Sequence, residues 1–166
     1  MPQPANVVVM GVSGSGKSTI GKLLAEKLGV PFTDADDLHP ESNVTKMAAG
    51  TPLEDEDRWP WLALVGDALA AASTTGLVVA CSALKRSYRE AILASAPATV
   101  FVLLHGPREL LSERMGHRDD HFMPLGLLDS QLATLELLEP DEPGFTVSIA
   151  PSPEMIVDEI AGKLSD

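Results

Sequence analysis

The chain has 166 residues, 45% of them hydrophobic and 22% charged, which is typical of one soluble globular domain that can bury its own core. Its formal net charge of −12 argues against nucleic acid or an anionic membrane surface as the main partner. The single cysteine, Cys81, excludes an internal disulfide framework, and no apolar run is long enough to cross a bilayer. We therefore expect a cytoplasmic protein with no nucleic-acid or membrane partner.

Strand and helix patterns alternate along the chain. Short apolar runs predict strands, and apolar residues at helical spacing predict helices. In chain order we expect a strand over Asn6–Met10, a helix over Gly16–Leu28, a strand over Pro31–Thr33, helices over Pro40–Ala49 and Trp59–Ala72, a strand over Leu77–Cys81, a helix over Lys85–Ala94, a strand over Thr99–Leu104, helices over Pro107–Arg114 and Leu125–Leu138, a strand over Phe145–Ile149 and a helix over Pro153–Leu164. The alternation predicts a single three-layer α/β domain over residues 1–166, with five parallel strands and helices on both faces.

The run after the first strand is a phosphate-binding motif. Residues 11–18, Gly-Val-Ser-Gly-Ser-Gly-Lys-Ser, fit G-x-x-x-x-G-K-[ST] at every fixed position. Glycines let backbone N–H groups turn toward a β-phosphate, and the next helix points its positive N-terminus at the same anion. In this motif Lys17 reaches the β- and γ-phosphates and the Ser18 hydroxyl binds Mg²⁺. The motif predicts a P-loop that binds ATP and Mg²⁺ through Gly11, Ser13, Gly14, Ser15, Gly16, Lys17, Ser18 and Thr19.

Two acids, Asp34 and Asp36, follow the second expected strand. Motor and switch ATPases usually carry an acid at the end of another hydrophobic strand, but here those strands end in Ser82 and His105. This difference favours a kinase. Acids at i and i+2 can divide the work, one acting toward the metal and one toward a substrate hydroxyl. The alternative is that they form only a helix N-cap and a turn.

The scarce cations gather near expected loops, which indicates a local anion pocket on an acidic body. Arg114 and Arg118 are four residues apart, before a polar stretch that is typical of a mobile lid. One interpretation is that they form surface ion pairs with Glu113 or Asp119; the other, which the family resemblance described below implies, is that they close over the phosphates. The other gathered cations, which alternatively only balance local acids, are Lys17, Lys46, Arg58, Lys85, Arg86 and Arg89.

Several blocks resemble the thermoresistant-type gluconate kinases, from the phosphate motif to about Glu139. They are Asp34–Pro40, Asn43, Lys46-Met47, Gly50, Pro52-Leu53, Asp57–Leu62, Cys81–Lys85, Tyr88-Arg89, His121-Phe122 and Ser130-Gln131. The resemblance implies a fold similar to shikimate and nucleoside-monophosphate kinases, with a substrate-binding segment at about 36–62 and a lid at about 115–124. It also implies that a homodimer transfers phosphate from ATP-Mg²⁺ to the 6-hydroxyl of D-gluconate.

The chain departs from the family pattern at two places. Ala35 stands where glycine is usual between the two acids. Asp119-Asp120 stands where the family often has a lysine or another residue followed by glycine, just before His121. The first is the smallest possible change, whereas the second bears on the stiffness of the lid and its affinity for anions.

The rival interpretations are a P-loop kinase for shikimate or another sugar acid, and a non-catalytic nucleotide sensor.

The resemblance also implies roles for single residues. Asp36 accepts or orients the proton of the substrate hydroxyl, and Asp34 supports Mg²⁺. Lys17, Arg114 and Arg118 are the expected catalytic cations. The expected substrate-binding residues are Asp36, His39, Lys46, Arg58, Lys85, Arg89 and Gln131.

Three points stay open at this stage. Either Arg58 or Arg89 meets the carboxylate of the substrate, because a planar guanidinium suits it better than a lysine. Lys46 either joins them or only pairs with acids nearby. The acidic run Glu54–Asp57 is expected to be a solvated loop that ends near a helix N-terminus.

Overall fold

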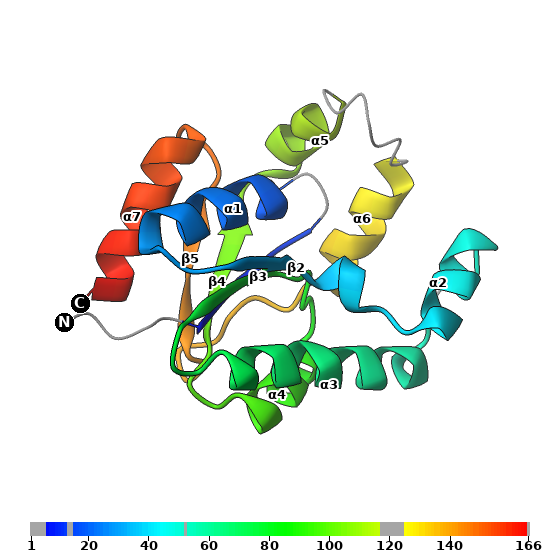
Figure 1. Cartoon of the computed structure of the whole chain (residues 1–166). Coiled ribbons are helices and arrows are strands. Elements are labelled where there is room, and N and C mark those ends of the chain that lie inside the picture. The colour runs from blue at the N-terminus through cyan, green and yellow to red at the C-terminus, as the bar shows by residue number, and fades with distance from the viewer. Residues whose placement is uncertain (1–5, 13–14, 52, 117–124, 166) are drawn as a thin grey trace.

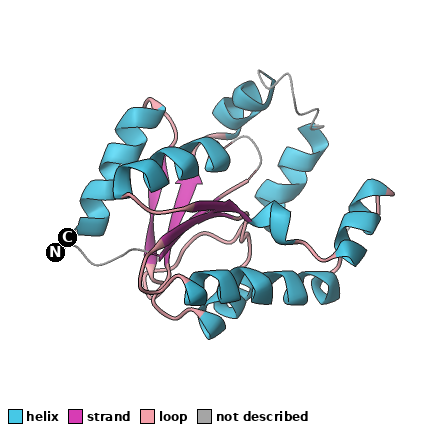
Figure 2. Ribbon diagram, viewed as in Figure 1, coloured by secondary structure: helices cyan, strands magenta, loops and turns pink. Residues whose placement is uncertain are grey.

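The computed structural model describes residues 6–12, 15–51, 53–116 and 125–165. Strands and helices alternate through these ranges, as Figures 1 and 2 show. The elements are β1 (Asn6–Met10), α1 (Lys17–Leu28), β2 (Phe32–Asp34), the 3-10 helix η1 (Ala35–Leu38), α2 (Glu41–Ala48), α3 (Asp55–Ala71), β3 (Leu77–Ala80), α4 (Arg86–Ser95), β4 (Val100–His105), α5 (Arg108–Gly116), α6 (Leu125–Thr134), β5 (Gly144–Ser148) and α7 (Pro153–Ser165).

The five strands form one parallel sheet in the order β2-β3-β1-β4-β5. The predicted α/β fold with a five-stranded parallel sheet is confirmed. β1 lies at the centre, where Val8 pairs with Val79 on one side and Phe101 on the other. The earlier strands β2 and β3 lie on one side of β1 and the later strands β4 and β5 on the other, so the loop after β1 lies at a topological switch point. Open α/β sheets bind their ligands at such points.

Helices cover both faces of the sheet, and β1 contributes alternate residues to the two cores. Val7 and Val9 belong to the core that includes residues of α1, α5, α6 and α7. Val8 and Met10 belong to the core beneath α3 and α4. Figure 1 shows this division, with α1 and α7 above the sheet and α3 and α4 below it. Because β1 is buried on both faces, its sequence is a continuous apolar run.

The acidic run before Trp59 lies at the N-terminus of α3, as expected, but it is not a loop: Glu54 is the N-cap and the three acids after it form the first turn of the helix. The helix begins at Asp55, and the Asp57 side chain accepts a hydrogen bond of 2.9 Å from the backbone N–H of Glu54. Acids in the first turn stabilise a helix because they face its positive end. The composition of this run is typical of a solvated loop. The hydrogen bond between Asp57 and the Glu54 N–H instead caps the helix, so that α3 begins within the run.

Helix α6 is shorter than the sequence predicts. The helix predicted over Leu125–Leu138 ends at Thr134, and the chain beyond it bonds to another segment through the Glu136 N–H and the Leu84 carbonyl, 2.7 Å apart. The short helix η1 begins directly after Asp34, so Asp34 is a helix N-cap, as the alternative interpretation of the acid pair had it. Within the described ranges, no helix is both long and apolar enough to span a membrane.

Candidate active site

The loop after β1 has the backbone shape that its glycines predict. Gly11 has a φ of +148°, and a Cβ there would lie 2.8 Å from the Leu104 carbonyl oxygen. Gly16 precedes α1 in the left-handed conformation, with φ 91°. Because side chains are poorly tolerated at both positions, glycine is required to bring the chain round to the N-terminus of α1. The predicted nucleotide residues Ser13 and Gly14 lie outside the described residues.

Side chains of the same loop bond back to its own backbone. The Ser15 hydroxyl donates to the Val12 carbonyl at 2.7 Å, and Lys17 Nζ donates to the same oxygen at 3.1 Å. The Gly11 N–H bonds to the Ser82 carbonyl beyond β3 at 3.3 Å. The loop is therefore shaped before any anion arrives, as a phosphate-binding site requires.

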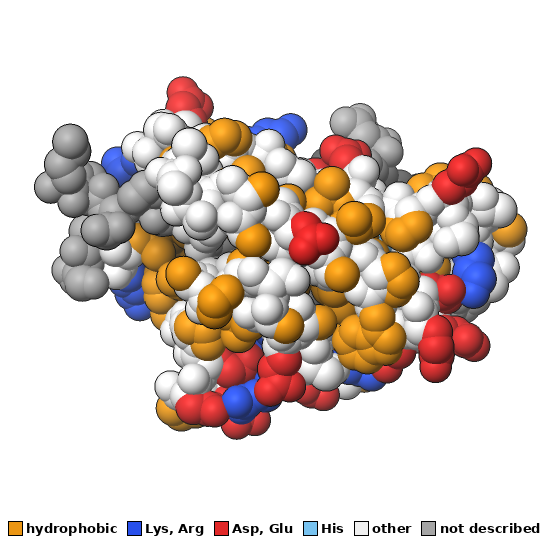
Figure 3. Space-filling view, turned by 60° about the horizontal axis from the view of Figure 1, so that its bottom comes forward, with side chains coloured by type: hydrophobic (Ala, Val, Ile, Leu, Met, Phe, Trp, Pro, Cys, Tyr) orange, Lys and Arg blue, Asp and Glu red, His pale blue; other side chains and the backbone are white. Residues whose placement is uncertain are grey.

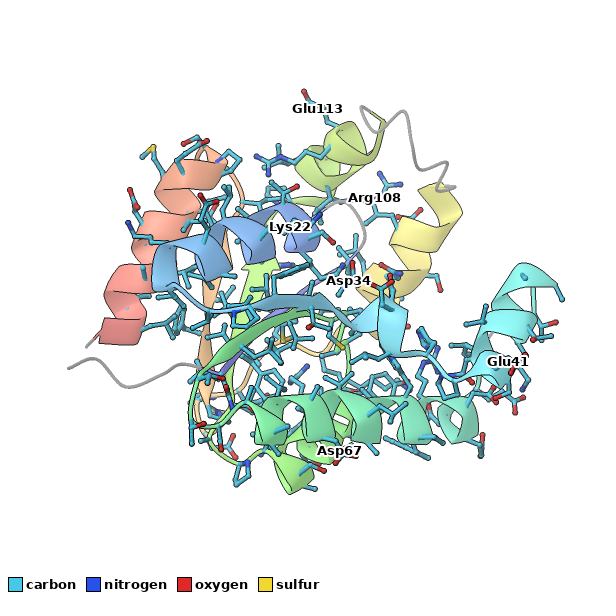
Figure 4. All side chains as sticks on the ribbon, in the orientation of Figure 1. Lys22, Asp34, Glu41, Asp67, Arg108 and Glu113 are labelled. Carbon is cyan, nitrogen blue, oxygen red and sulfur yellow. The ribbon has the colours of Figure 1, made fainter. Side chains whose placement is uncertain are left out.

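Asp34 joins the start of α1 to the end of β2. Its Oδ2 accepts a hydrogen bond of 3.1 Å from the Ser18 hydroxyl, and its Oδ1 accepts one of 3.0 Å from the Asp36 N–H. Figure 4 shows Asp34 at this end of the sheet, near the first turn of α1. Asp34 is thus the N-cap of η1 and also a neighbour of the expected Mg²⁺ ligand. A hydroxyl beside a carboxylate suits Mg²⁺, which prefers oxygen ligands and few of them from protein.

Asp36 lies two residues further on, in η1. Burial raises the pKa of Asp36, and the nearby Asp34 raises it further, whereas His39 and Lys17 pull it down. These influences show that Asp36 lies within electrostatic reach of both the phosphate-loop lysine and His39. A raised pKa makes the carboxylate a better proton acceptor than an ordinary aspartate.

His39 is held against Trp61 and Asn43. Its ring stacks on the Trp61 ring with centroids 4.2 Å apart and planes 14° apart. The Trp61 Nε1–H donates to the Ala35 carbonyl at 2.7 Å, and Asn43 Nδ2 lies 3.1 Å from His39 Nδ1. Burial lowers the pKa of His39, Asp36 opposes this change, and Arg58 adds to it. Sequence reasoning gave Asn43 and Trp61 no role of their own.

Arg58 and Lys85 meet at Tyr88. Arg58 Cζ lies 5.5 Å from the centre of the Tyr88 ring and Lys85 Nζ lies 5.7 Å from it. The Tyr88 hydroxyl donates to Asp55 at 2.8 Å, and Arg58 Nη1 lies 3.3 Å from the same carboxylate oxygen. Two predicted substrate-binding cations, one from α3 and one just before α4, therefore lie in one cluster. Arg58 also lies close enough to His39 to influence its pKa.

Arg89 is not in that cluster, and the structure argues against its predicted contact with the substrate. The side chain is fully buried, and its Nε and Nη2 donate to Glu142 at 2.6 and 3.0 Å while Nη1 donates to the Ala83 carbonyl at 3.0 Å. All three guanidinium nitrogens are engaged. Ala83 has a positive φ of 42°, unusual for a residue other than glycine. Arg89 therefore stabilises the loop between β3 and α4.

Glu142 is the partner that the sequence did not reveal. Burial alone would raise its pKa, but the hydrogen bonds from Arg89 and from the Glu139 backbone hold the pKa below its ordinary value. The carboxylate therefore stays ionised beside the guanidinium. Arg86 makes similar contacts at the surface, with Glu139 at 2.9 Å and Asp141 at 2.6 Å. These pairs fasten α4 to the segment that leads into β5.

The other predicted site residues, the remaining cations and Gln131, lie in different parts of the fold. Lys46 Nζ lies 2.8 Å from Asp57, so the alternative in which it pairs with a nearby acid is the one observed. Arg114 lies in the last turn of α5, and Gln131 is half-buried in α6. Arg118, Asp119-Asp120 and most of the expected lid lie outside the described residues.

Helices α5 and α6 are joined by an ion pair that sequence reasoning missed. Arg108 Nη2 donates to Asp129 Oδ2 at 3.0 Å, and Figure 4 shows Arg108 extending from α5 toward α6. The face shown in Figure 3, the underside of the molecule in Figure 1, is mostly apolar or uncharged, with acidic and some basic side chains toward its lower and right edges. Among the described residues, no three His, Cys, Asp or Glu side chains are grouped as a metal cluster.

Comparison with known proteins agrees with this geometry. Residues 13–142 match the family model for shikimate kinase. The gluconokinase of Gluconobacter oxydans is 46% identical over 160 residues, covering 95% of this chain and 90% of that protein. The gluconokinase of Arabidopsis thaliana is 43% identical over 171 residues, which cover 93% of this chain and 89% of that protein.

Solved structures give the same result. The crystal structure of a gluconokinase from Sinorhizobium meliloti has a TM-score of 0.88 and 50% identity, covering 99% of this chain and 93% of that one. Shikimate kinase from Aquifex aeolicus, at 22% identity and a TM-score of 0.63, shares the fold. Fold and site together define an ATP-dependent small-molecule kinase of the shikimate kinase-like P-loop type. Within that class, the chain belongs to the gluconokinase family.

Proposed function

We propose that this protein transfers the γ-phosphoryl group of ATP to the 6-hydroxyl of D-gluconate, giving 6-phospho-D-gluconate and ADP. The observation that carries the proposal is the similarity to gluconokinases over 95% of the chain, together with an Asp34–Asp36 pair beside the phosphate loop. Shikimate kinase-like proteins share the fold at much lower identity, which favours gluconate over shikimate as the substrate.

The nucleotide is proposed to bind over Gly11–Thr19, with its β-phosphate facing the backbone N–H groups and Lys17. Ser18 and Asp34, whose side-chain oxygens lie 3.1 Å apart, would hold Mg²⁺, with Asp34 acting through water. The metal supplies charge neutralisation at the β- and γ-phosphates when it is bound. Lys17, Arg114 and Arg118 supply further positive charge to the transferred group. Phosphoryl transfer depends mainly on such positioning and charge stabilisation.

Asp36 is proposed to accept the proton of the 6-hydroxyl as the hydroxyl oxygen bonds to the γ-phosphorus and the bond between the γ-phosphorus and the oxygen of the departing ADP breaks. Its raised pKa suits this role, and its electrostatic coupling to Lys17 indicates that it lies near the phosphate side of the site. His39, Gln131 and Lys85 are assigned to the substrate. Because Arg89 is fully buried and each of its guanidinium nitrogens donates to Glu142 or Ala83, we assign the carboxylate of gluconate to Arg58, with Lys85 beside it.

A coupled ADP-release assay tests the proposal, with D-gluconate, glucose, shikimate, glycerate and AMP as acceptors. Gluconate should be used far more efficiently than the others, and the product should carry phosphate on the terminal hydroxyl. Glucose has the same terminal hydroxyl but no carboxylate, so it leaves the guanidinium unpaired. Equal turnover of glucose and gluconate would contradict the proposed cation pocket. Preference for shikimate would show that the protein is a shikimate kinase and not a gluconate kinase.

We further propose that the active form is a homodimer working in the cytoplasm, as the family likeness implies. Sedimentation equilibrium of the purified chain tests the first part: a single species of twice the chain mass of 17.6 kDa is expected. A monomer with full activity would contradict it.

A further inference from the structure

Asn43 is an almost fully buried polar residue at the centre of the substrate segment, with 2% of its surface exposed. Its Nδ2 lies 2.9 Å from the Asp57 carbonyl oxygen, in the first turn of α3, and 3.1 Å from Nδ1 of His39. A backbone carbonyl only accepts hydrogen bonds, so the atom facing it must be the NH₂ group and not the amide oxygen. The network therefore fixes the orientation of the amide.

The same argument fixes the proton of His39. The NH₂ group has two hydrogens; one is given to Asp57, and the other is directed to His39 Nδ1. Nδ1 must then be the acceptor, which leaves the imidazole proton on Nε2. A proton on Nδ1 would face an N–H group and lose this contact.

We infer that Asn43 is a positioning residue that holds His39 as the Nε2–H tautomer and so presents a hydrogen-bond donor to a hydroxyl of the sugar-acid substrate. The inference deepens the proposed function and rests on it for the identity of the substrate. Stacking on Trp61 fixes the plane of the His39 ring, and the bond from Asn43 fixes which edge faces inward. Nε2, on the opposite edge, is the nitrogen left for the ligand.

The tautomer matters because Asp36 lies near. A hydroxyl that accepts a hydrogen bond from His39 Nε2–H has its own hydrogen free to donate to the Asp36 carboxylate. With the other tautomer, Nε2 would be an acceptor and would compete with Asp36 for that hydrogen. The charges facing His39 are Asp36 from η1 and Arg58 from α3, and burial together with Arg58 lowers the pKa of His39. The ring is therefore neutral at neutral pH, in agreement with the hydrogen-bond argument.

Nitrogen-15 NMR of the full chain labelled at histidine tests the assignment directly. Two-bond ring correlations distinguish the two neutral tautomers, and a His39→Gln variant identifies the signals of His39 among the four histidines. We expect the Nε2–H pattern at neutral pH, without substrate. An Nδ1–H pattern, or an equal mixture of the two, would overturn the inference.

An Asn43→Asp variant tests the consequence for substrate binding. Its carboxylate accepts from Nδ1–H, so neutral His39 changes tautomer and the pKa of His39 rises. Below that pKa the imidazolium still carries Nε2–H, whereas above it the donor is lost. The KM for gluconate should therefore rise by about tenfold as the pH increases through the new pKa, the size expected for one lost hydrogen bond. Wild-type KM should lack this rise.

The control is Thr45→Asp, which adds the same charge at an exposed position of α2. It should give the wild-type pH profile of KM. A loss in Asn43→Asp that is equal at every pH would show that Asn43 only supports the fold, and would overturn the inference. If the variant does not fold, the wild-type NMR pattern still decides. Absence of gluconate turnover by the wild type would refute the proposed function, while the tautomer would be judged from the spectrum alone.

Discussion

The nucleotide side and the substrate side of the site are built in different ways. The proposed nucleotide side is one contiguous segment, Gly11–Thr19, in which Gly11 and Gly16 have the positive φ that glycine allows. The proposed substrate side is assembled from side chains of η1, α2, α3 and the start of α4, held by contacts such as His39–Asn43 and Tyr88–Asp55. A local motif therefore specifies the first side, whereas the second depends on tertiary contacts.

The largest effect should come from Asp36, where the two sides meet. Asp36→Asn keeps the size of the side chain but removes the charge that accepts the hydroxyl proton. We expect kcat to fall by roughly 10²–10⁴-fold, the range typical for loss of a general base. Binding of ATP-Mg²⁺, measured by calorimetry, should change little.

Asp34→Asn is the matched control, because it removes the same charge two residues away. Its main effect should be a higher Mg²⁺ concentration for half-maximal rate, since Asp34 contacts the Ser18 hydroxyl. A magnesium titration of both variants separates them. If Asp36→Asn turned over normally while Asp34→Asn was inactive at saturating Mg²⁺, the two roles would be exchanged.

The two arginines that the sequence offered for the substrate carboxylate, Arg58 and Arg89, should respond differently to substitution. Arg89→Met leaves Glu142 buried without its partner, and breaking such a pair costs about 3–5 kcal/mol of unfolding free energy. Urea unfolding measures this loss, and the double variant Arg89→Met/Glu142→Gln should recover part of it. Wild-type stability of Arg89→Met, combined with a large rise in the KM for gluconate, would return Arg89 to the substrate site.

Arg58→Met should show the reverse behaviour. Its guanidinium lies beside Asp55 and the Tyr88 ring and is proposed to bind the carboxylate of gluconate. Losing a hydrogen bond to a charged group raises KM by roughly 10–100-fold. The KM for gluconate should therefore rise while the urea midpoint stays near wild type. Arg58→Lys keeps the charge but not the planar fork, and should recover the binding only in part.

The contrast between these arginines also marks what the sequence can predict. The strands, most helices and the phosphate loop follow from local patterns, and they were predicted. In the sequence, Arg58 and Arg89 each stand between an acidic and an aromatic residue. In the fold, however, Arg89 pairs with Glu142, 53 residues away, and this pair is buried. No spacing rule reveals such a partner. The start of α3 was misjudged for a related reason, because the acids of Glu54–Asp57 have the composition of a loop but act as a helix cap.

The Glu142 contact predicts a pH effect on stability. The pKa of Glu142 is held below its ordinary value near 4.5. A lowered folded-state pKa stabilises the fold above the unfolded-state pKa, and this contribution is lost as pH falls through the folded-state value. Glu142→Gln lacks the contribution, so its unfolding free energy should decrease less steeply below about pH 4.5 than that of the wild type. Parallel slopes, measured by urea unfolding across the acid range, would show that the pKa of Glu142 is the same in the folded and the unfolded chain, and would contradict the Arg89 contact as the cause of a lowered pKa.

The smallest effect should come from Lys46, which sequence reasoning left between two roles. Its Nζ lies 2.8 Å from Asp57, and the pair is partly exposed to solvent. The hydrogen bond to Asp57 raises the pKa of Lys46, so the ammonium is already committed to a neighbour.

Lys46→Met keeps the length of the side chain and removes only the charge. Exposed ion pairs contribute little free energy, and the ammonium of Lys46 is already paired with Asp57 and not with the substrate. The KM for gluconate should therefore stay within about fivefold of wild type. Asp57→Asn, which frees the ammonium, serves as the partner variant. If Lys46→Met raised KM as much as Arg58→Met does, the lysine would leave Asp57 to bind the substrate. The cation pocket would then include a residue of α2.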